Sequence, residues 1–369
     1  MIRPRWIPFL AAVLTVGSVT FAQETGPAVD PKERLRVAEE ALPDATKDRL
    51  RAVREFRSIR DGVLDKEGIL WIATSHGVLR IEGETITRMT EKDGLSHDFV
   101  SAVLEDQKGV LWFGTANGLT RYDRKDFTHI PLPWKDIHGD WIAGMYPLLD
   151  PNHAASLKEA ADGGLWVGTL GGGVYRYDGK DFQNFLHDKG KEYDDGQHHN
   201  WITSIEEDHQ GNLWFGSMSW GGATRYDGSS FKEFQVEDGL SDYMIRIIFQ
   251  ARDGKLWFGS NGNREGGVDR FDGKEFTNFQ ASNGHAHKHT ASIYQDRSGS
   301  LWFACGFDGI CTFDGEGFRS FSEEQGQAFE RINFFVEDAA GHLWFGGGKN
   351  ELYRFDGETV TDYSERLPE

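Results

Sequence analysis

The segment DHQGNLWFGS at residues 208–217, followed by RYDGSSF at 225–231, decides the fold because its pattern recurs along most of the chain. A second version, EDQKGVLWFGT, occupies residues 105–115. The tryptophans that mark the copies are Trp71, Trp112, Trp166, Trp214, Trp257, Trp302 and Trp344, spaced by 41, 54, 48, 43, 45 and 42 residues. Seven copies with this period predict a repeat architecture such as a propeller.

The chemistry within each copy favours four short strands. The continuous apolar run at 111–113 is typical of a strand that is covered on both faces. Asp-Gly pairs predict two-residue hairpin turns, and they begin at Asp178, Asp227, Asp272, Asp314 and Asp356. Radial closure would protect the strand edges that an open stack leaves bare. We therefore predict an all-β fold, a seven-bladed β-propeller of four-stranded blades, over residues 52–369.

The copies resemble the two-component-regulator propeller repeat, which is known from extracellular sensor regions of bacterial hybrid histidine kinases. Besides the stretches quoted above, DGLSHDFV at 93–100 and DGLSDYMI at 238–245 carry this resemblance. It implies a ligand-sensing propeller. Because the sequence ends at Glu369, one repeat's worth past Trp344, we expect no kinase or transmembrane module, and signalling would need a separate partner.

The N-terminus is typical of an export signal. Arg3 and Arg5 precede an uncharged stretch at 6–22, and small residues before Gln23 suit cleavage there. We predict a signal peptide at 1–22, a helical or linker segment at 23–51, and a periplasmic or secreted location. No membrane insertion is expected after cleavage, since the apolar run is shorter than the ~20 residues of a spanning helix. An uncleaved membrane anchor is the alternative.

Charge and cysteine content narrow the function classes. The 59 acidic residues outnumber the 40 Lys and Arg, giving a formal charge of −19. Because phosphate recognition uses clustered Lys and Arg, we do not expect a nucleic-acid partner. The two cysteines, Cys305 and Cys311, flank a predicted loop and are compatible either with a disulfide or with two half-buried thiols.

An arginine precedes the Tyr-Asp or equivalent pair in six copies, at Arg80, Arg121, Arg176, Arg225, Arg270 and Arg354, and Thr312 replaces it in the seventh. Recurrence in nearly every copy indicates a structural role. We expect these arginines to stack on the repeat tryptophan or to pair with a repeat aspartate.

Functional residues should lie where the copies differ, in loops that a rigid scaffold carries. The connections from the fourth strand to the next blade and from second to third strand emerge on one face. Of the 13 histidines, ten map to this loop face: His76, His97, His138, His153, His187, His198, His199, His285, His287 and His289.

Alignment of the copies on their turn glycines places a ring of polar and aromatic residues where the first strands enter the central channel. The predicted ligand-binding residues are His97, Asp98, His153, His199, Asn200, Trp201, Asp242, Tyr243, His287, His289 and Arg331. Aromatic rings beside hydrogen-bonding groups suit a ligand that is part flat and part polar, such as a saccharide.

Three interpretations of these residues remain. They decorate solvated loops, they form a non-catalytic site for a small molecule, glycan or other envelope protein, or they hold a divalent metal for a lyase or hydrolase. The metal interpretation uses His153, His199, His287 and His289, and His287-x-His289 would place two imidazoles on one strand face. No nucleophile-elbow motif or phosphate loop is present. We expect recognition without a cofactor rather than catalysis, and the partner is a small molecule or glycan, or another envelope protein such as a separate sensor kinase.

Overall fold

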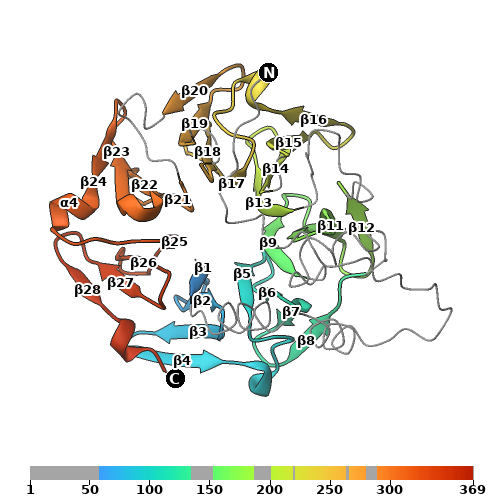
Figure 1. The fold of residues 1–369 in the computed structure, drawn as a ribbon. Coiled ribbons are helices and arrows are strands. Elements are labelled where there is room, and N and C mark those ends of the chain that lie inside the picture. The colour runs from blue at the N-terminus through green and yellow to red at the C-terminus, as the bar shows by residue number, and fades with distance from the viewer. Residues whose placement is uncertain are drawn as a thin grey trace, which may run out of the picture.

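The computed structural model describes residues 58–133, 153–186, 201–218, 221–262, 266–279 and 289–368. These residues form seven four-stranded antiparallel sheets arranged as blades around a centre (Figure 1). The strands of each blade follow one another in chain order from the centre outward. The predicted seven-bladed β-propeller is confirmed.

The first four blades contain sixteen strands. Blade one consists of β1 (Ile59–Leu64), β2 (Leu70–Thr74), β3 (Gly77–Glu82) and β4 (Thr85–Met89). Blade two consists of β5 (Val100–Glu105), β6 (Leu111–Thr115), β7 (Gly118–Tyr122) and β8 (Phe127–Ile130). Blade three consists of β9 (Ala154–Glu159), β10 (Leu165–Thr169), β11 (Val174–Tyr177) and β12 (Phe182–Phe185). Blade four consists of β13 (Ile202–Glu207), β14 (Leu213–Ser217), β15 (Ala223–Tyr226) and β16 (Phe231–Phe234).

The last three blades complete the ring. Blade five consists of β17 (Ile245–Gln250), β18 (Leu256–Ser260), β19 (Val268–Phe271) and β20 (Phe276–Phe279). Blade six consists of β21 (Ile293–Gln295), β22 (Leu301–Ala304), β23 (Ile310–Phe313) and β24 (Phe318–Ser320). Blade seven consists of β25 (Ile332–Glu337), β26 (Leu343–Gly347), β27 (Leu352–Phe355) and β28 (Val360–Asp362). The short helices are η1 (Glu91–Asp93), η2 (Val236–Asp238), η4 (Gly306–Asp308), α4 (Phe321–Gln325) and η5 (Ser364–Arg366).

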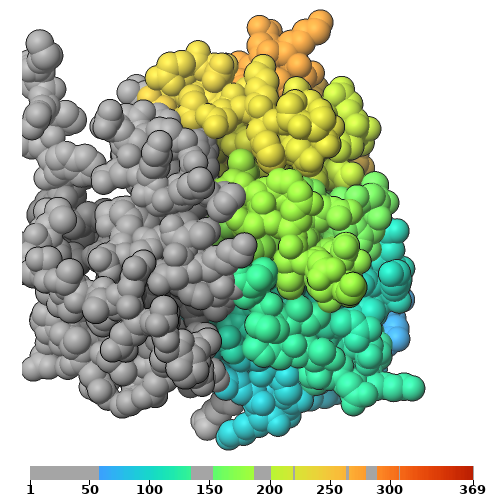
Figure 2. Space-filling view, turned by 90° about the vertical axis from the view of Figure 1, so that its right-hand side faces the viewer, coloured from blue at the N-terminus to red at the C-terminus, as the bar shows by residue number. Residues whose placement is uncertain are grey.

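The repeat tryptophan lies on the second strand and joins each blade to the next. In blade four, Trp214 is 1 % exposed and its ring centroid lies 5.6 Å from that of Phe258 in blade five. Directly opposite on the third strand, Arg225 places its guanidinium carbon 5.9 Å from the Trp214 centroid. Arg80, Arg270 and Arg354 lie over their own tryptophans in the same way. The predicted structural role of the repeat arginine is confirmed in these four blades. Figure 2 shows the outer wall, where successive blades follow one another from cyan to yellow.

The Asp-Gly pairs form the tight turns between third and fourth strands. In blade four, the Asp227 carboxylate accepts hydrogen bonds from the backbone of Ser229 and Ser230, at 2.9 and 2.8 Å. Gly228 has a φ of 90°, which a glycine adopts without strain. These bonds to its charged form lower the pKa of Asp227.

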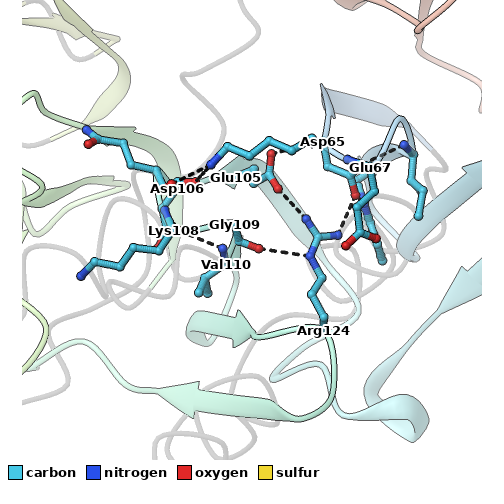
Figure 3. Close-up of polar contacts among 12 residues, drawn as sticks. Asp65, Glu67, Glu105, Asp106, Lys108, Gly109, Val110 and Arg124 are labelled. Carbon is cyan, nitrogen blue, oxygen red and sulfur yellow. Dashed lines mark hydrogen bonds and ion pairs between the residues drawn. The ribbon is translucent and has the colours of Figure 1, made fainter.

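Blade two replaces the turn glycine with Arg124, which keeps the positive φ at 77°. Its guanidinium donates to Asp65 of blade one and to Glu105 of blade two, both at 2.6 Å, and to the carbonyl of Gly109 at 3.1 Å (Figure 3). The side chains of Asp65 and Glu105 are 0 % and 6 % exposed. We call Arg124, Asp65 and Glu105 the Arg124 clasp. It joins blades one and two on the face opposite the loop face.

The ring closes without a blade shared between the two ends of the chain. All four strands of blade one are consecutive, and β1 packs against β25 of blade seven. Ser58 forms a β-bridge with Gly348, and Asn333 donates to the carbonyl of Ile59 at 2.9 Å. At the rim, Arg88 donates to the carbonyl of Pro368 at 2.8 Å. The expectation that each copy holds its own four strands is confirmed.

Other predictions concern the cysteines and the residues outside the described ranges. Cys305 and Cys311 are both buried free thiols joined by a side-chain hydrogen bond. Burial raises the pKa of Cys305. The predicted signal peptide at 1–22 and the segment at 23–51 lie outside the described residues.

Candidate ligand site at the channel mouth

A β-bulge shapes the start of the innermost strand in six blades. In β17, Ile245 pairs with Ser260 and Ile247 pairs with Gly259, so that Arg246 is an extra residue between them. The same register shift occurs in β1, β5, β9, β13 and β25. The residues at this position, which we call the bulge position, are Arg60, Ser101, Ala155, Thr203, Arg246 and Asn333. A bulge redirects a side chain, and three of these residues line the channel cavity described next.

The cavity has a volume of about 340 Å³ and lies at the channel mouth between blades five, six, seven and one. This volume is within the range of small-molecule sites. The innermost strands supply Arg60, Arg246, Ile332 and Asn333, and the loop-face connections supply the rest of the lining. Its residues are Ser58, Arg60, Arg246, Asn261, His289, Thr290, Ala291, Gly306, Arg331, Ile332, Asn333 and Gly348. None of these residues is acidic.

Arg246 crosses the cavity wall from blade five to blade seven. Its Nη2 donates to Oδ1 of Asn333 at 3.1 Å, and Asn333 in turn donates to Ile59 of blade one. Blade six lies between these blades and carries Ala291 at the equivalent point, where a short side chain leaves room. Burial lowers the pKa of Arg246.

Arg60 enters from blade one and lies over an aromatic ring of blade two. Its guanidinium carbon is 4.3 Å from the centroid of Phe99, and its buried Nε has no hydrogen-bond partner among the described residues. Burial and then repulsion from Arg246 lower the pKa of Arg60 to about 10. Arg60 therefore remains charged at neutral pH.

His153 also contacts the ring of Phe99. It is 7 % exposed, its ring meets that of Phe99 edge-on at 5.3 Å, and its Nε2 lies 2.7 Å from the hydroxyl of Ser101. Burial, and then the charges of Arg60 and His97, lower the pKa of His153 to about 3. The imidazole is neutral at physiological pH, and the nearby positive charge also disfavours a cation beside it.

The structure brings only some predicted residues into the cavity. His289 and Arg331 line it, whereas His153 lies beside Phe99. Half-buried Trp201 forms a β-bridge with Leu170 where β13 begins.

Four other predicted residues have local structural contacts. Nδ1 of His97 accepts from the backbone of Phe99 at 2.8 Å, and Asp98 accepts from the backbone of Glu91 at 2.7 Å. Asp242 is 0 % exposed and accepts from the backbone of Met244. The hydroxyl of Tyr243 donates to Glu237. None of these four lines the cavity described above, and their ligand-binding role stays a prediction.

His199, Asn200 and His287 lie outside the described residues. The seven histidines within the described ranges follow the expected division. His76, His97, His153 and His289 lie in loop-face connections, His209 and His342 lie in turns of the opposite face, and His129 lies in β8.

The prediction missed Arg60, Arg246 and Asn333, which lie two residues beyond the predicted ring. Counting back eight residues from the turn glycine in each copy would have found them. At that position two arginines and an asparagine interrupt first strands that are otherwise largely apolar.

Two features of the described ranges bear on the metal and membrane interpretations. Within these ranges, no three His, Cys, Asp or Glu side chains gather as a metal site would require. His199 and His287 lie outside these ranges, so the prediction of no cofactor and the alternative of a divalent metal both stay predictions. No helix in the described parts of the chain is long and apolar enough to cross a membrane.

Comparison with known families supports the repeat assignment. The model described as "Two component regulator propeller" matches residues 94–117, 196–219 and 239–262. The first and third segments begin at the glycine of a DGLS stretch, and the three segments include the second strands of blades two, four and five. The chain carries two-component regulator propeller repeats. No curated protein sequence matches it.

Solved structures share the propeller fold at low sequence identity. The extracellular domain assigned to the hybrid two component system BT3049 of B. thetaiotaomicron matches with a TM-score of 0.64 and 20 % identity, over 82 % of this chain and 39 % of that one. The corresponding domain of the one component system BT4673 of the same organism matches with a TM-score of 0.53 and 20 % identity, over 83 % and 48 %. This chain therefore spans less than half of either protein.

An enzyme also has this fold. Virginiamycin B lyase from Staphylococcus aureus matches with a TM-score of 0.53 and 18 % identity, over 72 % of this chain and 83 % of the lyase. At this identity the likeness concerns the fold alone, which hosts both recognition and catalysis.

Proposed function

We propose that this protein is an exported, non-catalytic recognition module that binds a small molecule or glycan at the channel mouth. The main support for this proposal is the cavity of about 340 Å³ on the loop face, to which four blades contribute polar side chains. The repeat and the extracellular sensor domains with the same fold support a sensing role. Transmission of the signal then requires another envelope protein, such as a separate sensor kinase.

The two sides of the mouth suit a ligand with a flat part and a polar part. Phe99 and the ring of His153 stand on the side of blades two and three. Arg246 and Asn333 stand on the side of blades five and seven. Neither ring lines the cavity itself, and Arg60 lies over Phe99, so these rings support the polar wall from behind. Aromatic groups together with fixed hydrogen-bond donors are typical of sites for saccharides and other polar ring ligands.

The experiment is calorimetric titration with a panel of plant and cell-wall saccharides, neutral and acidic. The variant Ala291→Phe fills the cavity, because Ala291 lines it from blade six. Its matched control is Ala155→Phe, at the equivalent position of blade three outside the cavity lining. We expect the first variant to abolish binding and the second to retain it. A silent panel, together with no captured envelope protein, would overturn the proposal.

A further inference from the structure

The cavity gathers positive charge within an acidic protein. Arg60, Arg246 and Arg331 all line it, although the chain has a formal charge of −19. No carboxylate belongs to the described lining. Arg331 is exposed, but Arg60 and Arg246 are half-buried. Charges withdrawn from water are normally paired, so these two guanidinium groups require an explanation.

The two innermost arginines have no ionic partner among the described residues. Arg246 has one polar side-chain contact there, to the neutral amide of Asn333. Arg60 faces an aromatic ring, and its Nε is buried without a hydrogen bond. The two guanidinium groups also repel one another. Both features disfavour the ligand-free state and would be relieved by an anion between them.

The third arginine is held at the mouth by an unusual backbone. Arg331 has a φ of 55°, its N–H donates to Gly306 of blade six at 2.9 Å, and its carbonyl accepts from Gly348 at 3.1 Å. Blade seven carries Gly347 where five of the other blades have Thr or Ser. A Cβ at that position would collide with the Arg331 carbonyl. Neighbouring backbone thus fixes a non-glycine residue in a sparsely populated conformation, as is common at functional sites.

We propose that the channel-mouth cavity is an oxyanion site, in which Arg60, Arg246 and Arg331 bind a carboxylate, sulfate or phosphate group of the ligand. This inference rests on the proposed recognition function and specifies the ligand's chemistry. Arginine suits the role because its planar fork donates two parallel hydrogen bonds to such groups. His289 and Asn333 line the same cavity and supply further polar atoms.

The experiment measures binding by calorimetry and by thermal shift, with four probes: sodium sulfate, inorganic phosphate, galacturonate and galactose. Galacturonate and galactose form a matched pair that differs in a carboxylate. We expect at least one anionic probe to bind and galactose to bind at least tenfold more weakly. At a hundredfold excess over Kd, the bound anion should raise Tm by about 5 °C. Preference for galacturonate identifies a carboxylate ligand, and preference for sulfate or phosphate identifies a tetrahedral oxyanion.

Variants test the assignment to these arginines. Arg60→Gln and Arg246→Gln should each weaken anion binding at least tenfold, whereas Arg319→Gln, at an exposed ion pair with Asp314, should not change it. Without anion, Arg60→Gln should melt no lower than the parent protein, because it removes a half-buried charge that has no ionic partner among the described residues. A loss of binding caused by misfolding would lower that Tm and is thereby distinguished.

The inference and the proposed function fail separately. If no anion binds, or if anion binding survives both arginine substitutions, the oxyanion site is overturned. A neutral saccharide whose binding is abolished by Ala291→Phe would then leave the recognition function standing. Anion binding that Arg60→Gln and Arg246→Gln abolish supports both.

Discussion

Trp71 donates its indole N–H to the carboxylate of Asp65 across 2.7 Å. The pair repeats as Trp112 with Asp106, Trp214 with Asp208, Trp302 with Asp296 and Trp344 with Asp338, at 2.7–3.0 Å. Alanines replace the aspartate in blades three and five, and the indole N–H groups of Trp166 and Trp257 have no hydrogen-bond partner among the described residues. In five blades the carboxylate thus accepts the hydrogen bond of the buried indole N–H, which would otherwise lack a partner.

Restoration of this pair in blade five should stabilise the protein. The turn at Ala251 has the same backbone bonds as the others, but its carboxylate comes two residues later, at Asp253. The double variant Ala251→Asp/Asp253→Ser moves the carboxylate without changing the net charge. We expect the free energy of unfolding to rise by about 1 kcal/mol, the typical contribution of one hydrogen bond. Urea denaturation measures it.

The reverse change supplies the control for this prediction. Asp106→Ala leaves the indole of Trp112 and two turn N–H groups without their acceptor. We expect a loss of about 2–4 kcal/mol, since each buried donor that lacks a partner costs about 1–3 kcal/mol. A blade-five variant that is less stable than the parent would contradict the prediction that an aspartate at position 251 stabilises this blade.

The Arg124 clasp should contribute to stability although a glycine would suit its turn better. Arg124→Gly relieves the positive φ but leaves the buried carboxylates of Asp65 and Glu105 without their cation. Burial raises the pKa of Asp65, but bonds from Trp71, Ile69 and Arg124 outweigh it and lower that pKa overall. We expect a net loss of about 2–3 kcal/mol in urea denaturation, because an uncompensated buried charge costs more than the turn strain.

Two further variants test this explanation of the Arg124 clasp. Addition of Glu105→Gln to Arg124→Gly should recover part of the loss, because it removes one of the uncompensated charges. Arg319→Gln, at an exposed pair, should change stability by less than about 0.5 kcal/mol. Equal stability of Arg124→Gly and the parent would contradict a stabilising role for the clasp.

The sequence predicted the features that every blade repeats. The repeat period, the apolar runs and the Asp-Gly turns predicted the closed ring of blades, because burial between blades requires the same residues in each copy. The cavity depends instead on single residues. Arg246 reaches Asn333 across blade six because Ala291 is small. The bulge that turns Arg60 inward cannot be predicted from the spacing of apolar residues. Asp98 and Asp242, which were predicted to bind the ligand, also accept backbone hydrogen bonds close in sequence, a local role that the pattern did not predict.

Metal removal should leave the protein unchanged. Burial, and then the positive charge of Arg60, lower the pKa of His153, and that charge also opposes a cation near the imidazole. We expect dialysis against EDTA to alter neither Tm nor saccharide binding, and elemental analysis to find no stoichiometric metal. Stoichiometric metal that disappears in the variant His287→Ala/His289→Ala would instead revive the metal-dependent interpretation.

Asp61 should make stability fall as pH rises from about 4 to 6. Burial raises its pKa to about 6, against the hydrogen bonds from Val103 and Gly62 that lower it. The folded state therefore holds a proton that the unfolded chain, with a pKa of about 3.9, has released. This contribution to stability is complete below pH 4 and is lost as pH rises through 6. Burial also raises the pKa of Asp269 to about 6. Its effect on stability therefore has the same sign.

The variant Asp61→Ser isolates this effect, because β13 carries a serine at the equivalent position. The hydroxyl of Ser204 accepts from the backbone of Ile248 at 2.9 Å, as Asp61 accepts from Val103 at 3.0 Å. Relative to the parent, the variant should gain about 1–2 kcal/mol in the free energy of unfolding between pH 4 and 6. His153, with its pKa lowered to about 3, gives the parent an opposite slope in this range. Only the difference between the two proteins, measured by urea denaturation at each pH, is therefore informative. Parallel profiles would mean that Asp61 ionises in the folded protein as it does in the unfolded chain.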